Sequence, residues 1–208
     1  MKTILSSINS LKNSKTKNVI DSRINEFSKF KNKTCTDIFN ELCFCLLTAN
    51  YSAEGAIRIQ KEIGTGFISL PKLKLAKELK SLGYRFPNKR AEYISEARKH
   101  KNKIKETICG FNNEFEARDW LVENVKGLGF KEASHFLRNI GYENLAIIDF
   151  HIIDVLVKHK LIEKPKTLTK KKYLEIEKLL EKIAKKANLK QGELDFYLWY
   201  LETGKILK

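Results

Sequence analysis

Two residues that follow a glycine-framed turn are the best candidates for chemistry in this chain. Gly127 and Gly129 frame the turn, Lys131 follows it by two residues, and Asp149 comes after the next apolar run. A neutral lysine amine is a nucleophile that forms Schiff bases, and a carboxylate stabilises a developing positive charge. Backbone N–H groups at the turn and at the start of the next helix can bind a phosphate. This combination predicts chemistry on a nucleic acid.

Each of these features also has a plain structural interpretation. Lys131 is one of many lysines and is also interpretable as a solvated surface amine, and Asp149 is well placed to cap a helix. A Gly-x-Gly sequence between helices is a common turn. The two interpretations of Asp149 are compatible, since the N-terminus of a helix stabilises negative charge.

Composition favours a folded protein with a polyanionic partner. The chain has 208 residues with 42% hydrophobic positions, enough for a core in one two-lobed domain or two small domains. It carries 40 basic and 25 acidic side chains, a formal net charge of +15. Such an excess favours binding to nucleic acid, although lysine-rich usage can also reflect genome composition.

The cysteines and the N-terminus point to an intracellular protein. No C-x-x-C pair occurs, so the spacing disfavours zinc and predicts buried, reduced thiols. Ser6 and Ser7 interrupt the N-terminal apolar residues, which excludes a signal peptide, and no apolar run approaches the length of a membrane span. We expect a monomer without membrane contact. The cysteines are Cys35, Cys43, Cys45 and Cys109.

Helical periodicity dominates the chain, so we predict an all-α fold. Thr36 is the expected N-cap of an apolar central helix that runs through Leu47. Residues 64–66 are expected to be a break between helices. The other predicted helices are Ile4–Leu11, Val19–Phe30, Ala53–Ile63, Leu70–Gly83, Asn88–His100, one capped by Asn113 that runs to Val125, one after the turn that runs to Ile140, one from Asp149 through Leu156, Tyr173–Ala187 and Glu193–Thr203.

Several segments together resemble a known family. Lys126–Ala133, with its turn and lysine, and Ile148–His151 resemble the helix-hairpin-helix DNA glycosylase superfamily. Glu41–Asn50, Lys89–Ile94 and Trp199–Lys208 are similar to its archaeal-type 8-oxoguanine DNA glycosylase/AP lyase branch. The resemblance implies two helical lobes with the active cleft between them. Residues 35–144 would form the lobe with the hairpin, and residues 1–34 with 149–208 would form the other.

The resemblance also implies a reaction on damaged double-stranded DNA. The target nucleotide would be flipped out of the duplex into the cleft. Lys131 would attack the anomeric sugar carbon and release 8-oxoguanine, while Asp149 would stabilise the cationic sugar and assist proton transfers. The resulting Schiff base would permit β-elimination and strand cleavage. The open alternatives are a helix-hairpin-helix glycosylase for another damaged base and a DNA-binding protein without enzymatic activity.

Further site residues follow from the same resemblance. Phe86, Trp199 and the carboxylate of Lys208 would hold the lesion base, although core packing is an alternative for both aromatics. Asn50 would fill the gap that the flipped base leaves, or it would simply end a helix. The residues expected to contact the DNA backbone are Gly127, Gly129, Lys126, His151 and Arg90, with a solvated basic face as the alternative for the arginine.

The implied chemistry needs no metal or organic cofactor, although hairpin carbonyls such as those of Val125 and Gly127 would be able to hold a monovalent cation. The four-cysteine cluster of the endonuclease III branch is absent near the C-terminus, which argues against an iron–sulfur cluster. Phe150 is bulkier and less polar than expected beside Asp149, which places a polar DNA contact at that position in doubt.

Overall fold

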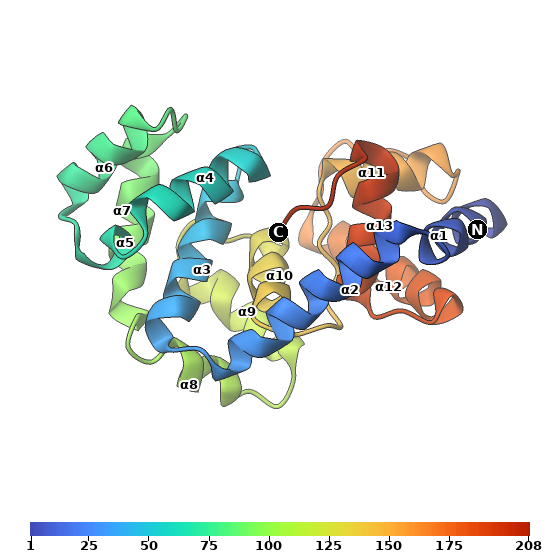
Figure 1. Cartoon of the computed structure of the whole chain (residues 1–208), viewed down its shortest axis with the longest axis horizontal. Helices are drawn as coiled ribbons and strands as arrows, with labels where there is room; N and C mark the ends of the chain where they lie inside the picture. Colours follow the sequence, from blue (N-terminus) through green and yellow to red (C-terminus); the bar gives the residue numbers. More distant parts are fainter.

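The protein consists of helices and connecting loops. The computed structural model describes residues 1–208 and contains no strand, which confirms the all-α prediction. Figure 1 shows two lobes side by side, with α3 to α10 in one, and α1 and α11 to α13 in the other. Helix α2 runs along the junction between them. None of the helices is long and apolar enough to cross a membrane.

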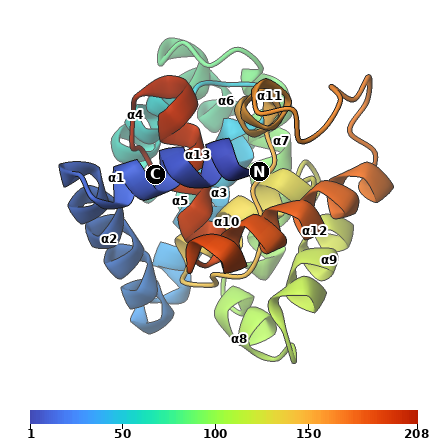
Figure 2. The same cartoon turned by 90° about the vertical axis from the view of Figure 1, so that its right-hand side faces the viewer.

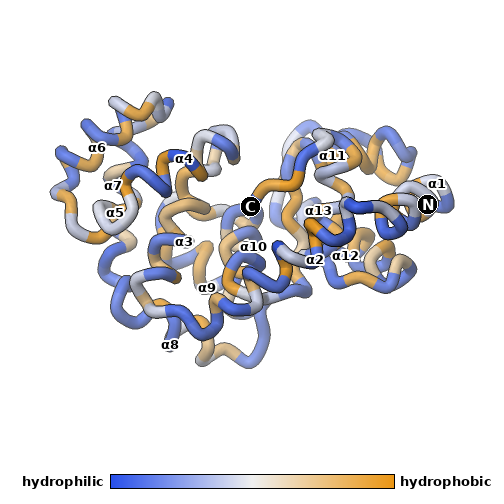
Figure 3. Tube along the Cα trace, viewed as in Figure 1, coloured by the Kyte–Doolittle hydropathy of each residue, from blue (hydrophilic) through white to orange (hydrophobic).

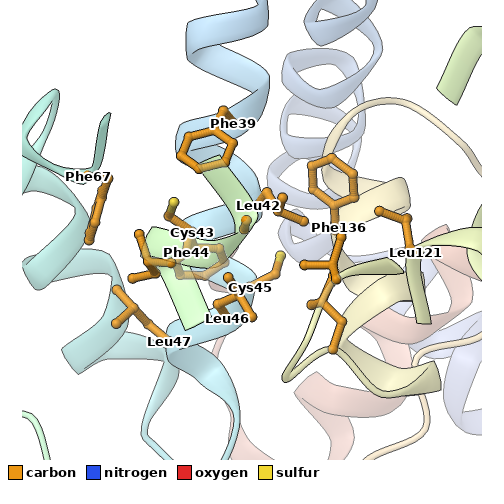
Figure 4. Packing of buried hydrophobic residues seen from close by; sticks show 14 of the residues in the cluster. Phe39, Leu42, Cys43, Phe44, Cys45, Leu46, Leu47, Phe67, Leu121 and Phe136 are labelled. Carbon is orange, nitrogen blue, oxygen red and sulfur yellow. The ribbon is translucent and has the colours of Figure 1, made fainter. Parts of the chain in front are cut away.

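The first lobe is built around α3, whose second half is buried on every side. Its helices are α3 (Cys35–Thr48), α4 (Ala53–Ile63), α5 (Gly66–Ser69), α6 (Lys72–Ser81), α7 (Pro87–Ala97), α8 (Ile104–Cys109), α9 (Glu114–Asn124) and α10 (Phe130–Asn139), with a 3-10 turn at Arg98–His100. Figure 4 shows Phe39 and Phe44 of α3 among Phe67, Leu121 and Phe136 from the surrounding helices. A helix that is apolar all round belongs in a core.

The cap of α3 differs from the sequence prediction. Thr34, not Thr36, is the N-cap: its hydroxyl accepts the N–H of Asp37, whose carboxylate accepts the N–H of Thr34 in return. This reciprocal pair satisfies two helix-end donors at once. Cys43 and Cys45 are buried as predicted, and burial raises the pKa of both thiols. The prediction was wrong for Cys109, which is exposed at the end of α8, and Cys35 is only partly buried.

The second lobe joins the two ends of the chain. Its helices are α1 (Lys2–Lys12), α2 (Lys15–Ser28), α11 (Phe150–Lys158), α12 (Lys170–Ala187) and α13 (Gln191–Thr203), with a 3-10 turn at Lys29–Asn32. Figure 2 shows α1 lying across α13. Lys12 Nζ donates to the carbonyl oxygen of Ala187 at 2.6 Å, and Ile4, Ile8 and Tyr197 are completely buried between these helices.

Short helices account for most of the other differences from the predicted elements. α5 and α8 were not predicted, because four and six residues are too few to show a helical period. Helices of ten residues or more are easier to recognise: in Figure 3, hydrophilic and hydrophobic positions both occur along α6. The predicted caps at Asn113 and Asp149 are confirmed, since each side chain accepts N–H groups of the helix it precedes.

A buried ion pair joins the two lobes away from the C-terminal end. Arg118 of α9 donates two hydrogen bonds to the two carboxylate oxygens of Glu177 of α12, at 2.6 and 2.8 Å. Both residues are at most 5% exposed, and Glu177 also accepts the N–H of Ala146 at 3.1 Å. This contact lies next to the point where the chain passes from one core to the other, since Leu145 packs in the first and Ala146 in the second.

Candidate active site between the lobes

The principal cavity lies where the lobes meet. It has a volume of about 790 Å³ and is lined by α10, the 147–151 segment, α13, the loop after α3 and the C-terminal residues. Pockets of roughly 300–1,000 Å³ are typical of small-molecule sites. The cavity therefore has room for a nucleobase and part of its sugar.

The hairpin before α10 depends on one glycine more than on the other. Gly127 has φ +91°, and a Cβ added there would lie 2.3 Å from Tyr93 Cδ2, so only glycine fits. Gly129 is extended at φ −95°, and its N–H donates to the Glu132 carboxylate at 3.2 Å. Of the two glycines, only Gly127 has a backbone conformation that other residues rarely adopt. The N–H of Gly129 is already engaged within the chain.

One wall of the cavity is a basic face of α10. Lys131 is the second residue of this helix, its side chain is 22% exposed, and its Nζ lies 3.7 Å from a carboxylate oxygen of Glu132. His135 and Arg138 follow one and two turns later, and all three line the cavity. The lysine is thus half-buried beside other nitrogen-bearing side chains, with room before it for a reacting atom.

Burial disfavours the charged form of His135. Burial, followed by the nearby charges of Arg138 and Lys131, lowers its pKa well below the usual value. Its Nε2 lies 3.1 Å from the main-chain oxygen of Lys208, which can only accept, so Nε2 carries the proton. Nδ1 has no partner in the chain.

The segment after the apolar run and α13 add acidic and aromatic residues to the lining. Asp149 is the N-cap of α11 and accepts the N–H of Ile152 at 3.0 Å, which leaves its second carboxylate oxygen for the cavity that it lines. Phe150 is 65% exposed at the mouth. The His151 ring lies 3.9 Å from the Phe150 ring and 5.6 Å from the Trp199 ring, centroid to centroid.

Another carboxylate in the same cavity, that of Asp195, was missed by the sequence interpretation. Asp195 is 9% exposed, and one of its oxygens lies 3.7 Å from a terminal nitrogen of Arg138. Burial raises the pKa of Asp195 to about 7, with Arg138 opposing and Asp149 adding to the rise. Asp195 precedes Trp199 by one helical turn, and this spacing was the signal that both share a face of α13.

The structure brings most of the predicted site residues together. Lys131 and Asp149 share the cavity, and so do the other predicted lining residues: Asn50, His151, Trp199 and Lys208. Asn50 has φ +59°, a conformation common for asparagine just after a helix. Phe86 is not among the lining residues; it is 43% exposed, and the guanidinium of Arg85 lies 5.0 Å from its ring.

Two predicted backbone-contact residues are engaged elsewhere. Arg90 is only 6% exposed and donates to the Tyr84 hydroxyl and the Ala49 carbonyl, so it is neither a solvated basic residue nor free for phosphate. Its role is to support the loop after α3. Lys126 is exposed, but its ammonium bonds to Glu92 and Glu96 at 3.0 and 3.2 Å, which raises its pKa.

Comparisons with known proteins agree on one family. The family model for 8-oxoguanine DNA glycosylase matches residues 20–189. The chain is 57% identical to an 8-oxoguanine DNA glycosylase/AP lyase of Methanocaldococcus jannaschii over 99% of both chains, and 51% identical to one of Korarchaeum cryptofilum over 95% and 94%. A crystal structure of the M. jannaschii enzyme with a 15mer DNA containing 8-oxoguanine superimposes with a TM-score of 0.97, at 56% identity, covering 99% of this chain and all of that one.

The likeness to these proteins, in sequence and in fold, extends over nearly the whole chain. The chain belongs to the 8-oxoguanine DNA glycosylase family of helix-hairpin-helix proteins.

Proposed function

We propose that this protein excises 8-oxoguanine from duplex DNA and then cleaves the strand at the abasic site. The observation that carries the proposal is the placement of Lys131 and Asp149 in one cavity whose size suits a flipped nucleotide. A relative that superimposes on the whole fold was crystallised with DNA containing 8-oxoguanine, which supports the same substrate here. Both walls of the cavity come from one chain, so a monomer suffices.

The reaction starts at the anomeric carbon of the flipped nucleotide. The neutral amine of Lys131 forms a bond to this carbon while the glycosidic bond breaks, and the departing base takes a proton. Asp149 stabilises the positive charge that develops on the sugar. The amine adduct loses a proton and opens to a Schiff base, which acidifies the neighbouring 2′ position. Loss of a 2′ proton then expels the 3′ phosphate and breaks the strand by β-elimination. Lysine and aspartate supply these steps without a cofactor.

The lesion is distinguished by one hydrogen. The N7 position of guanine is an acceptor, whereas in 8-oxoguanine it carries a hydrogen and donates. The group that distinguishes the lesion at this position must therefore be a hydrogen-bond acceptor. The main-chain oxygen of Lys208, a residue that lines the cavity, is such an acceptor. Trp199 supplies an aromatic face for stacking. Phe86 lies outside the cavity and would contact a different part of the duplex.

The DNA backbone would be held by the hairpin and the positive charge of the protein. The net charge of +15 attracts the duplex, and the N–H of Gly127 makes no hydrogen bond within the chain. His151 lies at the mouth of the cavity, and Lys126 would exchange its carboxylate partners for phosphate. A monovalent cation held by the carbonyls of Val125 and Gly127 would add a bridge to phosphate.

Borohydride trapping tests the proposal directly. Wild-type protein mixed with an 8-oxoguanine duplex and borohydride should form a covalent protein–DNA adduct, because reduction fixes the Schiff base. Lys131→Gln should form none while keeping its affinity for the duplex. Lys158→Gln, at an exposed lysine at the end of α11, is the matched control and should trap normally.

Three outcomes would contradict the proposal in different ways. Trapping by Lys131→Gln would exclude this lysine as the nucleophile. Trapping only on duplexes with uracil or an oxidised pyrimidine would indicate another lesion. Salt-sensitive binding without any adduct or strand cleavage would indicate a protein that only binds DNA.

A further inference from the structure

We propose that Glu41, a residue outside the reaction chemistry, positions Lys208 for reading the lesion. Its carboxylate holds the Lys208 ammonium inside the first lobe, so that the main-chain oxygen of Lys208 stays in the cavity. This inference rests on the proposed function, because it assigns a role in selecting the base that this function removes. Glu41 is a positioning residue, since it acts through Lys208 and contacts no substrate.

Glu41 is a carboxylate in the middle of an apolar helix. It is 1% exposed on α3, between residues that are completely buried. Its oxygens accept from Asn139 Nδ2 at 2.7 Å and Gln60 Nε2 at 3.2 Å, and they pair with Lys208 Nζ at 2.5 Å. A buried carboxylate is costly unless it is paired with a cation. Lys208 is the one cation in contact with it, and α3 itself supplies none.

Lys208 is held at both of its ends. Its ammonium also donates to Gln60 Oε1 at 2.7 Å and lies 4.6 Å from the centroid of the Phe44 ring. Its main-chain oxygen accepts from His135 Nε2 at 3.1 Å, one helical turn after Lys131. In Figure 1 the C-terminal end leaves α13 in the second lobe and crosses to α10 in the first. The side chain thus fixes where the main-chain oxygen lies.

Fixing this oxygen in advance has a direct consequence for selectivity. Residues after a last helix are usually poorly ordered unless something ties them down. If the main-chain oxygen of Lys208 had to be ordered when DNA binds, the cost of ordering would lower the affinity for the lesion. An oxygen that is already ordered does not carry this cost. The buried ion pair orders Lys208 before DNA arrives, so the hydrogen bond to the lesion contributes fully. An abasic site has no base to read, and its cleavage should not depend on this ordering.

The same tail contains a natural control. Lys205 Nζ pairs with Glu54 at 2.6 Å, but both side chains are more than half exposed. Exposed pairs contribute little, because solvent screens them. This pair also joins the tail to the first lobe, yet it lacks the buried carboxylate. If any contact of the tail sufficed, loss of the Lys205 pair would matter as much as loss of the Lys208 pair.

The test compares two activities of each variant on matched duplexes. Glu41→Gln keeps the shape and removes the charge, and Lys208→Met removes the ammonium while keeping the main-chain oxygen. Each should lower kcat/KM for 8-oxoguanine excision about 10-fold or more, and lower β-elimination at a preformed abasic site far less. The double variant should be no worse than the single ones, because both break one contact. Lys208→Arg should restore part of the excision. Lys205→Met should lower the ratio of excision to abasic-site cleavage far less than Glu41→Gln or Lys208→Met does.

A second measurement needs no DNA. Carboxypeptidase B removes C-terminal lysine, and in protein that ends at Lys208 the buried pair should slow its release. Glu41→Gln should release Lys208 about 10-fold faster, whereas Lys205→Met should leave the rate near that of wild type. Unchanged release from Glu41→Gln would overturn the anchoring role.

The outcomes separate this inference from the proposed function. Equal losses of excision and abasic-site cleavage in Glu41→Gln, in step with a lower melting temperature, would make Glu41 merely structural and overturn the proposal. Excision by Glu41→Gln at the wild-type rate would overturn it as well. If wild type does not excise 8-oxoguanine, the proposed function fails together with the reading role, while the carboxypeptidase rates still decide whether Glu41 anchors Lys208.

Discussion

Two buried arginine–carboxylate pairs join the hairpin helices to the second lobe, and they are built differently. Arg118 of α9 meets Glu177 of α12 in two short hydrogen bonds, and Arg118 also contacts the Ser134 hydroxyl at 3.3 Å. Arg138 of α10 approaches Asp195 of α13 only to 3.7 Å. Nε and one terminal nitrogen of Arg138, and one oxygen of Asp195, have no partner in the chain.

The difference separates a contact that holds the lobes together from one that faces a ligand. The Arg118–Glu177 pair engages both terminal nitrogens of the arginine and both carboxylate oxygens, and only Nε of Arg118 has no partner, so the pair is expected in a permanent joint. Buried polar atoms without partners are rare, and those of Arg138 and Asp195 line the cavity. The Arg138–Asp195 pair thus leaves more buried polar atoms without a partner than the Arg118–Glu177 pair does, and it does so on two residues that line the cavity.

Breaking the Arg118–Glu177 pair, called the tight pair below, should have the largest effect on stability. Arg118→Met leaves the Glu177 carboxylate buried without its cation, which should lower the free energy of unfolding by about 3–5 kcal/mol. Urea unfolding followed by circular dichroism measures this loss. Arg118→Met combined with Glu177→Leu should recover most of it, because no buried charge remains. A loss below about 1 kcal/mol in the single variant would show that the tight pair is not what joins the lobes.

In the Arg138–Asp195 pair, called the loose pair below, the raised pKa of Asp195 should make the stability of the protein depend on pH. The pKa of Asp195 is about 7 in the folded protein, above its value of about 3.9 when unfolded. Between these values the folded state binds more protons, so this group makes stability fall as pH rises from about 4 to 7 and stay level above. Within that window the slope approaches about 1.4 kcal/mol per pH unit. Asp195→Asn should remove this contribution, which unfolding curves at several pH values would reveal. A difference between wild type and variant that is independent of pH would contradict the raised pKa.

Breaking an exposed ion pair should change the free energy of unfolding least, and this change is the reference for the two buried pairs. Lys164 Nζ and Asp154 lie 2.6 Å apart, as close as the tight pair, but their side chains are 65% and 36% exposed. Asp154→Asn should change the free energy of unfolding by less than about 1 kcal/mol, and added salt should reduce the difference further. Chemical denaturation at low and high salt checks this. A larger effect would mean that distance rather than burial sets the strength of these pairs.

Local signals predicted the parts of the site that are close in sequence. Lys131 and Asp149 were found because a hairpin, a lysine two residues later and a helix cap form a compact pattern. Arg118 and Glu177 are 59 residues apart, and nothing in either neighbourhood shows that they meet. The burial of Arg90 was missed for a similar reason, since the Ala49 carbonyl that it donates to lies 41 residues away in the sequence. Side-chain pairing across the fold depends on tertiary packing, which periodicity does not encode.

The joining of both chain ends in the second lobe affects how the protein is made. The Lys12–Ala187 contact links residues 175 positions apart, whereas the core of the first lobe uses only residues 38–145. During synthesis from the N-terminus, the first lobe can therefore fold while α12 and α13 are still absent. The apolar faces of α1 and α2, with Ile4, Ile8 and Ile20, therefore stay exposed to solvent until α12 and α13 have been synthesised. The first residues made are among the last to find their partners.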